Sequence, residues 1–132
     1  DYEEGTFTPV IEGTSSNPSY TTSDASGSYT KIGNRVLFEI LIVVTGVSSQ
    51  GSGTVKITGL PYSSASGYAG VFTINYNDIW NKNVRTGWAS GTALYPSPNT
   101  VNQHPTNWST SSGENDLQLS TGYFTISGQY RV

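Results

Sequence analysis

Residues 35–45, RVLFEILIVVT, decide the fold of this chain of 132 residues. Successive side chains of a strand point to opposite faces, and one face of this segment is apolar throughout: Val36, Phe38, Ile40, Ile42 and Val44. The opposite face carries Leu37, Leu41 and Val43 and is interrupted by Glu39. A strand at the solvent surface of a lone antiparallel sheet alternates apolar and polar side chains. We therefore expect one face to fill a core and the other face to be covered.

The cover over Leu37, Leu41 and Val43 has two candidate sources. Exposed apolar patches usually mark interfaces, so another copy of the chain is the simplest cover. A loop of the same chain, folded over the strand, is the alternative. We favour self-association and assign these three residues to an interface between copies.

Period-2 alternation also dominates the rest of the chain, and no segment has a sustained helical period. About eight or nine strands are expected, the others lying at 6–12, 28–32, 54–60, 68–77, 84–89, 92–95, 117–119 and 123–132. Pro9 cannot donate to a ladder, so the first run is predicted to be an edge strand. Gly33-Asn34 and Ser90-Gly91 are predicted hairpin turns.

Two polar stretches, residues 14–28 and 96–115, are predicted to be loops because they are rich in residues that favour turns. The second is long for a compact domain, and such loops are often functional. The pattern as a whole predicts one domain over residues 1–132, an all-β antiparallel sandwich of the jelly-roll type.

The charge of the chain disfavours nucleic acid and anionic membranes as partners. Its six Lys and Arg residues are scattered, and the formal net charge is -3. Nucleic-acid and lipid headgroup binding both need clustered cations. No apolar run approaches the roughly 20 residues that span a bilayer, so no membrane insertion is expected. The chain has no cysteine, which excludes disulfides and thiolate zinc sites. The acidic N-terminal segment lacks the features of a signal peptide and suggests a boundary within a longer protein.

Catalytic patterns are weak. The single histidine, His104, lies in a Pro-rich loop, and no G-x-S-x-G segment marks a nucleophile. A glycosidase needs two carboxylates that flank one bond. Glu114 and Asp116 are close enough in sequence to share a site, but Asn115-Asp116 equally forms a turn. We expect no enzyme activity and no cofactor.

The segment from Asn75 to Asn83 is rich in side-chain oxygens, which are the ligands that Ca²⁺ prefers. Its spacing is not that of a calcium loop, and Asn and Asp also favour turns through local hydrogen bonds. We favour the turn and expect no metal site.

Large aromatic side chains mark a possible ligand site. Trp88 lies within a strand and is expected in the core or an interface. Trp80 and Trp108 lie in polar loops, where an indole either plugs the end of the sandwich or offers a flat apolar face to a sugar. The candidate ligand contacts are Trp108, His104, Asn107, Gln103, Tyr95 and Trp80.

Four segments together resemble one family. They are DYEEGTFTP at 1–9, GSYTKIGNRVLFEI at 27–40, ITGLPY at 57–62 and ISGQYRV at 126–132. They resemble the C-terminal β-sandwich domain of bacteriophage tail fibres and tailspikes, in an order and spacing that cover most of the chain. Residues 78–83 and 96–116 depart from the family pattern, and no functional residue is carried over by motif.

The resemblance implies an extracellular part of a virion. Domains of this family assemble as trimers at the host-facing tip, so a homotrimer is expected. The function expected is a non-catalytic host-recognition domain that binds a bacterial cell-surface polysaccharide or lipopolysaccharide. The alternative is a structural domain that trimerises or caps the fibre and makes no receptor contact.

Overall fold

Strands and connecting turns make up the whole of the described chain. The structure, a computed structural model, describes residues 1–67, 69–81, 83–98, 107–108 and 116–132. The strands are β1 (Tyr2–Phe7), β2 (Val10–Gly13), β3 (Ser19–Ile32), β4 (Arg35–Ser49), β5 (Val55–Thr58), β6 (Gly70–Asn77), β7 (Val84–Ser90), β8 (Ala93–Pro98), β9 (Asn107–Trp108), β10 (Asp116–Leu117) and β11 (Gly122–Arg131). No helix in these ranges is long and apolar enough to cross a membrane.

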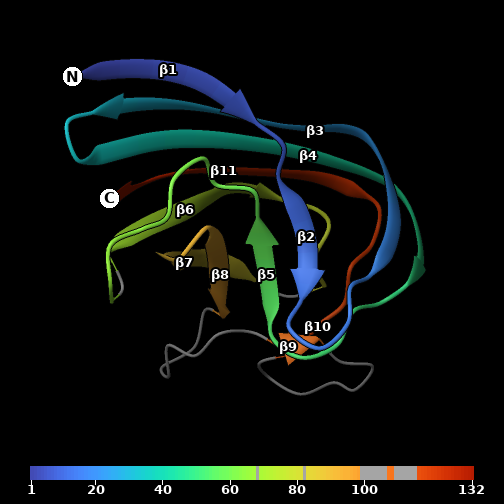
Figure 1. Cartoon of the computed structure of the whole chain (residues 1–132). Helices are drawn as coiled ribbons and strands as arrows, with labels where there is room; N and C mark the ends of the chain where they lie inside the picture. Colours follow the sequence, from blue (N-terminus) through green and yellow to red (C-terminus); the bar gives the residue numbers. More distant parts are fainter. Residues whose placement is uncertain (68, 82, 99–106, 109–115) are drawn as a thin grey trace.

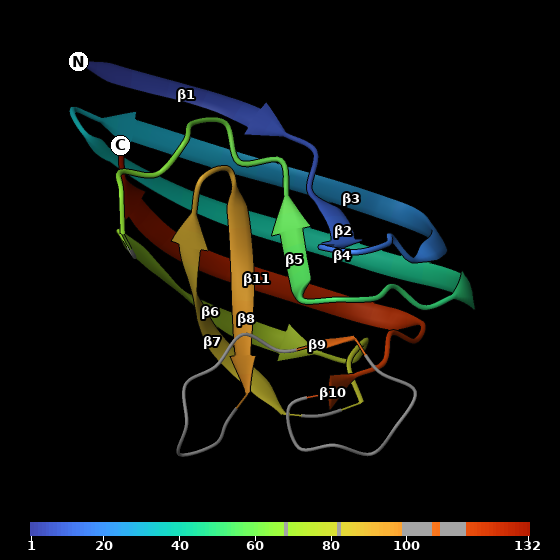
Figure 2. The ribbon, with the colours of Figure 1, turned by 60° about the horizontal axis from the view of Figure 1, so that its bottom comes forward.

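Nine of the strands form one continuous antiparallel sheet, in the order β1-β3-β4-β11-β6-β7-β8-β5-β2 (Figure 1). β9 and β10 form a separate parallel pair. The predicted all-β antiparallel class is confirmed. The predicted jelly-roll sandwich of two sheets is not, because the single sheet curls into a half-barrel and encloses its own core (Figure 2).

The curl follows from the step between β1 and β2. These strands are consecutive in the chain but form opposite edges of the sheet, and only Thr8 and Pro9 lie between them. Three Cα–Cα steps join Phe7 to Val10 and reach at most about 11 Å, so the two edges must lie close together there. The predicted edge position of this segment is confirmed. The single strand predicted over 6–12 is replaced by two strands.

Two features keep the chain close together where the two edges approach each other. The hydroxyl of Tyr20 on β3 accepts a hydrogen bond from the amide of Ile11 on β2, at 2.8 Å. Gly59 has φ 110, and a Cβ there would run into the carbonyl oxygen of Thr8. Only glycine adopts that conformation without strain.

The core lies in the hollow of the curl. The predicted inward face of β4 is buried, with Val36, Phe38, Ile40, Ile42 and Val44 each at most 3% exposed. β11 lies between β4 and β6 and buries Phe124, Ile126 and Tyr130, the face that its alternation predicted. Its central position explains why its inward residues are apolar throughout.

One row of paired residues crosses all nine strands on the inner face. From edge to edge it consists of Glu3, Lys31, Val36, Tyr130, Gly70, Ala89, Leu94, Ile57 and Ile11. The row mixes large and small side chains, and a Cβ at Gly70 would run into Tyr130. A glycine at this position therefore lets β6 lie close against Tyr130 of β11.

The largest difference from the sequence-based expectation is in β3. Residues 14–28 were predicted to be a loop, but β3 begins at Ser19 and pairs with β4 along its length, with register shifts between Ser19 and Asp24. Ser and Thr suit a strand that is exposed on one side. The two predicted hairpin turns are confirmed, with positive φ at Gly33 and Gly91.

Candidate functional site

The outer face of β4 carries an apolar strip that no described strand covers. Leu37 is 47% exposed and Ile32 on β3 is 55% exposed, while Leu41 and Val43 are half-buried. We call Ile32, Leu37, Leu41 and Val43 the outer strip. The alternative cover, a loop of the same chain, is absent among the residues that the structure describes. The assignment of Leu37, Leu41 and Val43 to an interface between copies stays a prediction.

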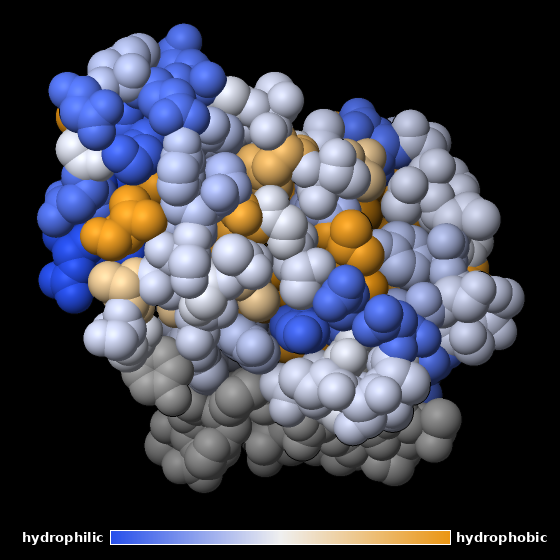
Figure 3. Space-filling view, in the orientation of Figure 1, coloured by the Kyte–Doolittle hydropathy of each residue, from blue (hydrophilic) through white to orange (hydrophobic). Residues whose placement is uncertain are grey.

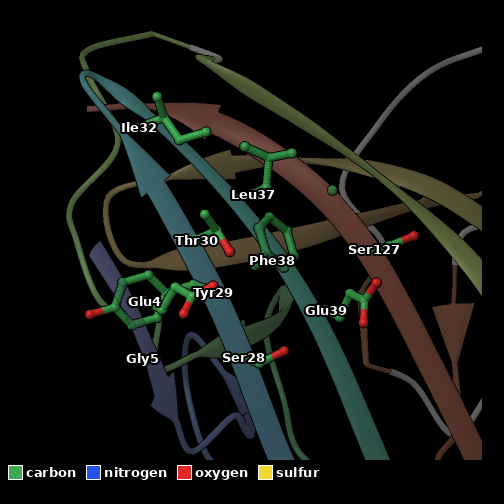
Figure 4. Close-up of a pocket in the computed structure, with 11 residues that line it drawn as sticks. Glu4, Gly5, Ser28, Tyr29, Thr30, Ile32, Leu37, Phe38, Glu39 and Ser127 are labelled. Atoms are coloured by element: carbon green, nitrogen blue, oxygen red, sulfur yellow. The ribbon is translucent and has the colours of Figure 1, made fainter. Parts of the chain in front are cut away.

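A shallow groove of about 600 Å³ lies at the end of the outer strip that Ile32 and Leu37 form. Ile32 and Leu37 lie side by side at one end of it, and Glu39 and Ser127 lie further along (Figure 4). Small residues, including Ser28 and Gly128, also line it. A shallow groove in which Ile32 and Leu37 lie among hydroxyl and carboxylate side chains suits a protein surface better than a small ligand.

A cluster of tyrosines surrounds Glu3 at the corner where the N-terminus lies. One carboxylate oxygen of Glu3 accepts hydrogen bonds from the hydroxyls of Tyr29, at 2.6 Å, and Tyr62, at 2.5 Å. These bonds lower the pKa of Glu3 and raise the pKa of both tyrosines. Lys31 lies over the ring of Tyr62. Hydrophilic side chains gather at this corner (Figure 3).

Tyr130 joins this cluster to the core. Its hydroxyl accepts a hydrogen bond from the amide of Tyr62, at 3.3 Å, and burial raises the pKa of Tyr130 to about 12. We call Glu3, Tyr29, Tyr62 and Tyr130 the tyrosine cluster. Sequence reasoning did not single out these residues. A signal existed, because each of the four family-like segments supplies one member of the cluster.

Trp80 lies in the core at the opposite end of the molecule. It is 5% exposed, and its ring meets Phe124 edge-on, with centroids 6.1 Å apart. A buried indole offers no face to a sugar, so the expected ligand contact at Trp80 gives way to the packing alternative. The side chain of Asn77 holds this turn, since its Oδ1 accepts hydrogen bonds from the amides of Ile79 and Trp80.

The hydrogen bonds of Asn77 also show what the side-chain oxygens of the segment from Asn75 to Asn83 do. Oδ1 of Asn77 is occupied by the turn, and Oδ1 of Asn81 accepts a hydrogen bond from the amide of Gln118. No group of three or more His, Cys, Asp or Glu side chains lies together in the described ranges. Oδ1 of Asn77 therefore serves the turn, while Oδ1 of Asn81 holds the backbone at Gln118.

Tyr95 lies at the surface, half-buried, with its ring stacked on that of Trp88 at a centroid distance of 6.4 Å. Strict alternation along the strand would put Trp88 on the same face as Val84, which is buried. A register shift between Val84 and Thr86 instead places Trp88 on the outer face. Of the other candidate contacts, Asn107 and Trp108 are described only as the backbone of β9, while Gln103 and His104 lie outside the described residues. Ligand binding at these residues stays a prediction.

Comparison with known proteins shows the fold. No family model matches the chain, and no curated protein matches it. A solved structure, the crystal structure of the Dettilon tailspike protein (gp208), matches 98% of this chain with a TM-score of 0.64 and 21% identity. The match covers 24% of that tailspike. The chain therefore shares a fold with about a quarter of a phage tailspike.

Proposed function

We propose that this chain is a non-catalytic domain of a phage tail fibre or tailspike, which assembles as a homotrimer and recognises the bacterial surface. The observation that carries the proposal is the uncovered outer strip on a fold shared with a tailspike. On this proposal the domain belongs to the extracellular part of the virion. The alternative, a purely structural trimerisation or capping domain, shares the assembly and lacks the receptor contact.

The energetics of the outer strip support assembly. Completing the burial of a half-exposed leucine or isoleucine contributes roughly 1 kcal/mol per side chain. Ile32 and Leu37 are both about half exposed, and each would be buried once in every copy. A stable interface buries about 1,000 Å² or more, so the polar groove beside the strip must be covered with it.

Light scattering on the purified chain tests the assembly. We expect a mass of three copies. Leu37→Asp should raise the dissociation constant by roughly thirtyfold or more, the loss expected of an interface hot spot. Leu37 is exposed within one chain, so the variant keeps its fold. Val10→Asp is the matched control, because Val10 is 39% exposed on the opposite edge of the sheet. A wild-type chain that stays a single copy would refute the assembly.

Binding to an array of bacterial lipopolysaccharides and capsular polysaccharides tests recognition. The stacked pair of Tyr95 and Trp88 supports it, because an apolar aromatic surface suits the C–H face of a sugar. A trimer that binds no glycan would favour the structural alternative.

A further inference from the structure

β6 and β7 separate halfway along β6. Their ladder runs from Gly70 and Ala89 to Thr73 and Thr86 and stops there. β6 continues to Asn77 on the side of β11 alone. The gap forms a slot of about 160 Å³ lined by Ile74, Asn75, Tyr76, Asn77, Asn83, Val84 and Arg85.

Two β-bulges face this slot, one in each wall. On β6 the pairing with β11 passes from Ile74 to Tyr76, so Asn75 is the extra residue. On β7 the pairing with β8 passes from Val84 to Thr86, so Arg85 is the extra residue. Bulges re-aim side chains or end pairing, and they are over-represented beside functional sites. Here the two bulges lie where the pairing between β6 and β7 ends.

The side chains around the slot are suited to hydroxyl groups. Asn75 exchanges hydrogen bonds with the hydroxyl of Ser127, at 3.1 and 3.3 Å. An amide has two N–H donors and two lone pairs on its oxygen, so a held Asn75 keeps one donor and one lone pair for a ligand. Asn83 is exposed on the opposite wall. Asn75, which the protein holds in place, and Asn83, which is exposed, together suit neighbouring hydroxyls of a sugar.

An aromatic ring and a cation complete the set. Tyr76 is 57% exposed on the outer face, opposite Thr125. Arg85 is exposed and forms no ion pair within the described ranges. The carboxylate of Asp78, close in sequence, instead lies beside Gly122. A guanidinium in a polar slot matches a carboxylate with two parallel hydrogen bonds.

We propose that the slot and the Tyr76 ring form a binding site for an acidic saccharide. One face of a sugar ring lies on Tyr76, its hydroxyls bond to the amides of Asn75 and Asn83, and its carboxylate pairs with Arg85. This proposal rests on the recognition function and gives it a location and a ligand class. The residues that line the slot do not include the expected contacts Tyr95 and Trp108.

The size of the slot limits how much of a ligand enters. Small-molecule pockets measure about 300–1,000 Å³, and this slot has about 160 Å³. It therefore takes the polar edge of one sugar unit, while the remaining units lie over the outer face. A peptide strand fits less well, because the free edge of β6 spans only 74–77, shorter than the usual strand of about 5–6 residues.

A glycan array with two substitutions and two matched controls tests the site. The array carries capsular polysaccharides and lipopolysaccharides with acidic and neutral repeat units, together with alginate and dextran. We expect the wild-type chain to bind acidic polymers. Arg85→Gln and Tyr76→Ala should each lower that binding about tenfold, the scale of one charge-assisted hydrogen bond or one stacked ring.

The controls carry the same changes elsewhere on the sheet. Tyr2→Ala removes a tyrosine that is 64% exposed, and Arg131→Gln removes an exposed arginine on β11. Both should bind as the wild type does. All four positions are at the surface, so the fold is retained, which circular dichroism checks.

The outcomes separate the site from the general function. Glycan binding that survives both Arg85→Gln and Tyr76→Ala would place recognition elsewhere and overturn the site alone. Binding to neutral polymers alone would overturn the acidic ligand class. A wild-type chain that binds no polymer on the array would overturn the recognition function and the site together.

Discussion

The two ends of the curled sheet are held together by different kinds of hydrogen bond. At the tyrosine cluster, hydroxyls of Tyr29 and Tyr62 bond to the carboxylate of Glu3, side chain to side chain, and the hydroxyl of Tyr130 alone bonds to a backbone group, the amide of Tyr62. At the opposite end, around Trp80, amide side chains bond to the backbone. Gln50 both donates to the carbonyl of Leu119, at 2.9 Å, and accepts from its amide, at 2.7 Å.

This difference bears on which positions tolerate change. A bond between two side chains needs the right residue at both positions. A bond from a side chain to a backbone group needs only one, because every residue except proline offers the same backbone donor and acceptor. The end around Trp80 therefore keeps these hydrogen bonds when the residues that supply the backbone partners are substituted. Residues 78–81 at this end belong to a segment that departs from the pattern of the family that the chain resembles.

The largest expected effect is at Tyr130, where the tyrosine cluster enters the core. Tyr130→Ala should lower the free energy of unfolding by about 3–5 kcal/mol, the usual loss for a buried aromatic ring. Tyr130→Phe keeps the ring and removes only the acceptor for the amide of Tyr62, so it should cost about 0.5–1.5 kcal/mol. Urea unfolding followed by fluorescence measures both. Equal losses for the two variants would contradict this account.

A middle-sized effect is expected at Gln50, which fastens the opposite end. Gln50→Ala leaves both backbone groups of Leu119 without that partner. The expected loss is about 1–3 kcal/mol, measured by the same unfolding experiment. Gln50→Glu is the informative second variant, because it keeps one acceptor and loses the donor. A loss below that of a typical surface substitution would show that water replaces the side chain.

Acid should weaken the tyrosine cluster before the other end. The hydroxyls of Tyr29 and Tyr62 lower the pKa of Glu3 from its ordinary 4.5. A carboxyl with a lowered pKa stabilises the fold above the unfolded-state pKa, and this contribution disappears as pH falls through the folded-state pKa. The free energy of unfolding should therefore fall as pH drops below about 4.5, and this fall should be shallower in Glu3→Gln. If the pH profiles of the wild type and of Glu3→Gln were parallel, Glu3 would not be the source of this fall in stability.

The smallest effect is expected at Gln118, whose backbone amide bonds to Asn81. Gln118→Ala keeps that amide and should change the free energy of unfolding by less than about 0.5 kcal/mol, as is usual for positions without a specific role. Asn81→Ala removes the acceptor and should cost more. If the order of these two variants were reversed, the contrast between the two ends would fail.

Short-range patterns in the sequence were enough to predict part of the fold. The two faces of β4 and β11 and the hairpin turns at Gly33 and Gly91 all follow from short-range patterns, and the structure has them. The strand at 19–27 was missed because its Ser and Thr content is also typical of loops. The single curled sheet was missed because it depends on pairings between residues that are far apart in the chain.

The candidate sites also divide into features that one short segment determines and features that depend on distant strand pairings. The apolar outer face of β4 was predicted because it lies in one short segment. The slot between β6 and β7 was missed, since neither the bulge at Asn75 nor the bulge at Arg85 has a sequence signature. The bulge at Arg85 also explains the misplaced face of Trp88. The Asn-rich segment drew attention to Asn75 and Asn83, but only as a turn.

The central position of β11 has a consequence for biosynthesis. This strand completes the ladders of both β4 and β6, yet the ribosome makes it after every other strand of the sheet. Until then, the apolar strand β4 and the later strand β6 both have open edges, and open edges readily pair with other chains and aggregate. The nascent chain must therefore stay soluble without a finished sheet. A stop codon before residue 122 should yield insoluble protein rather than a smaller folded domain.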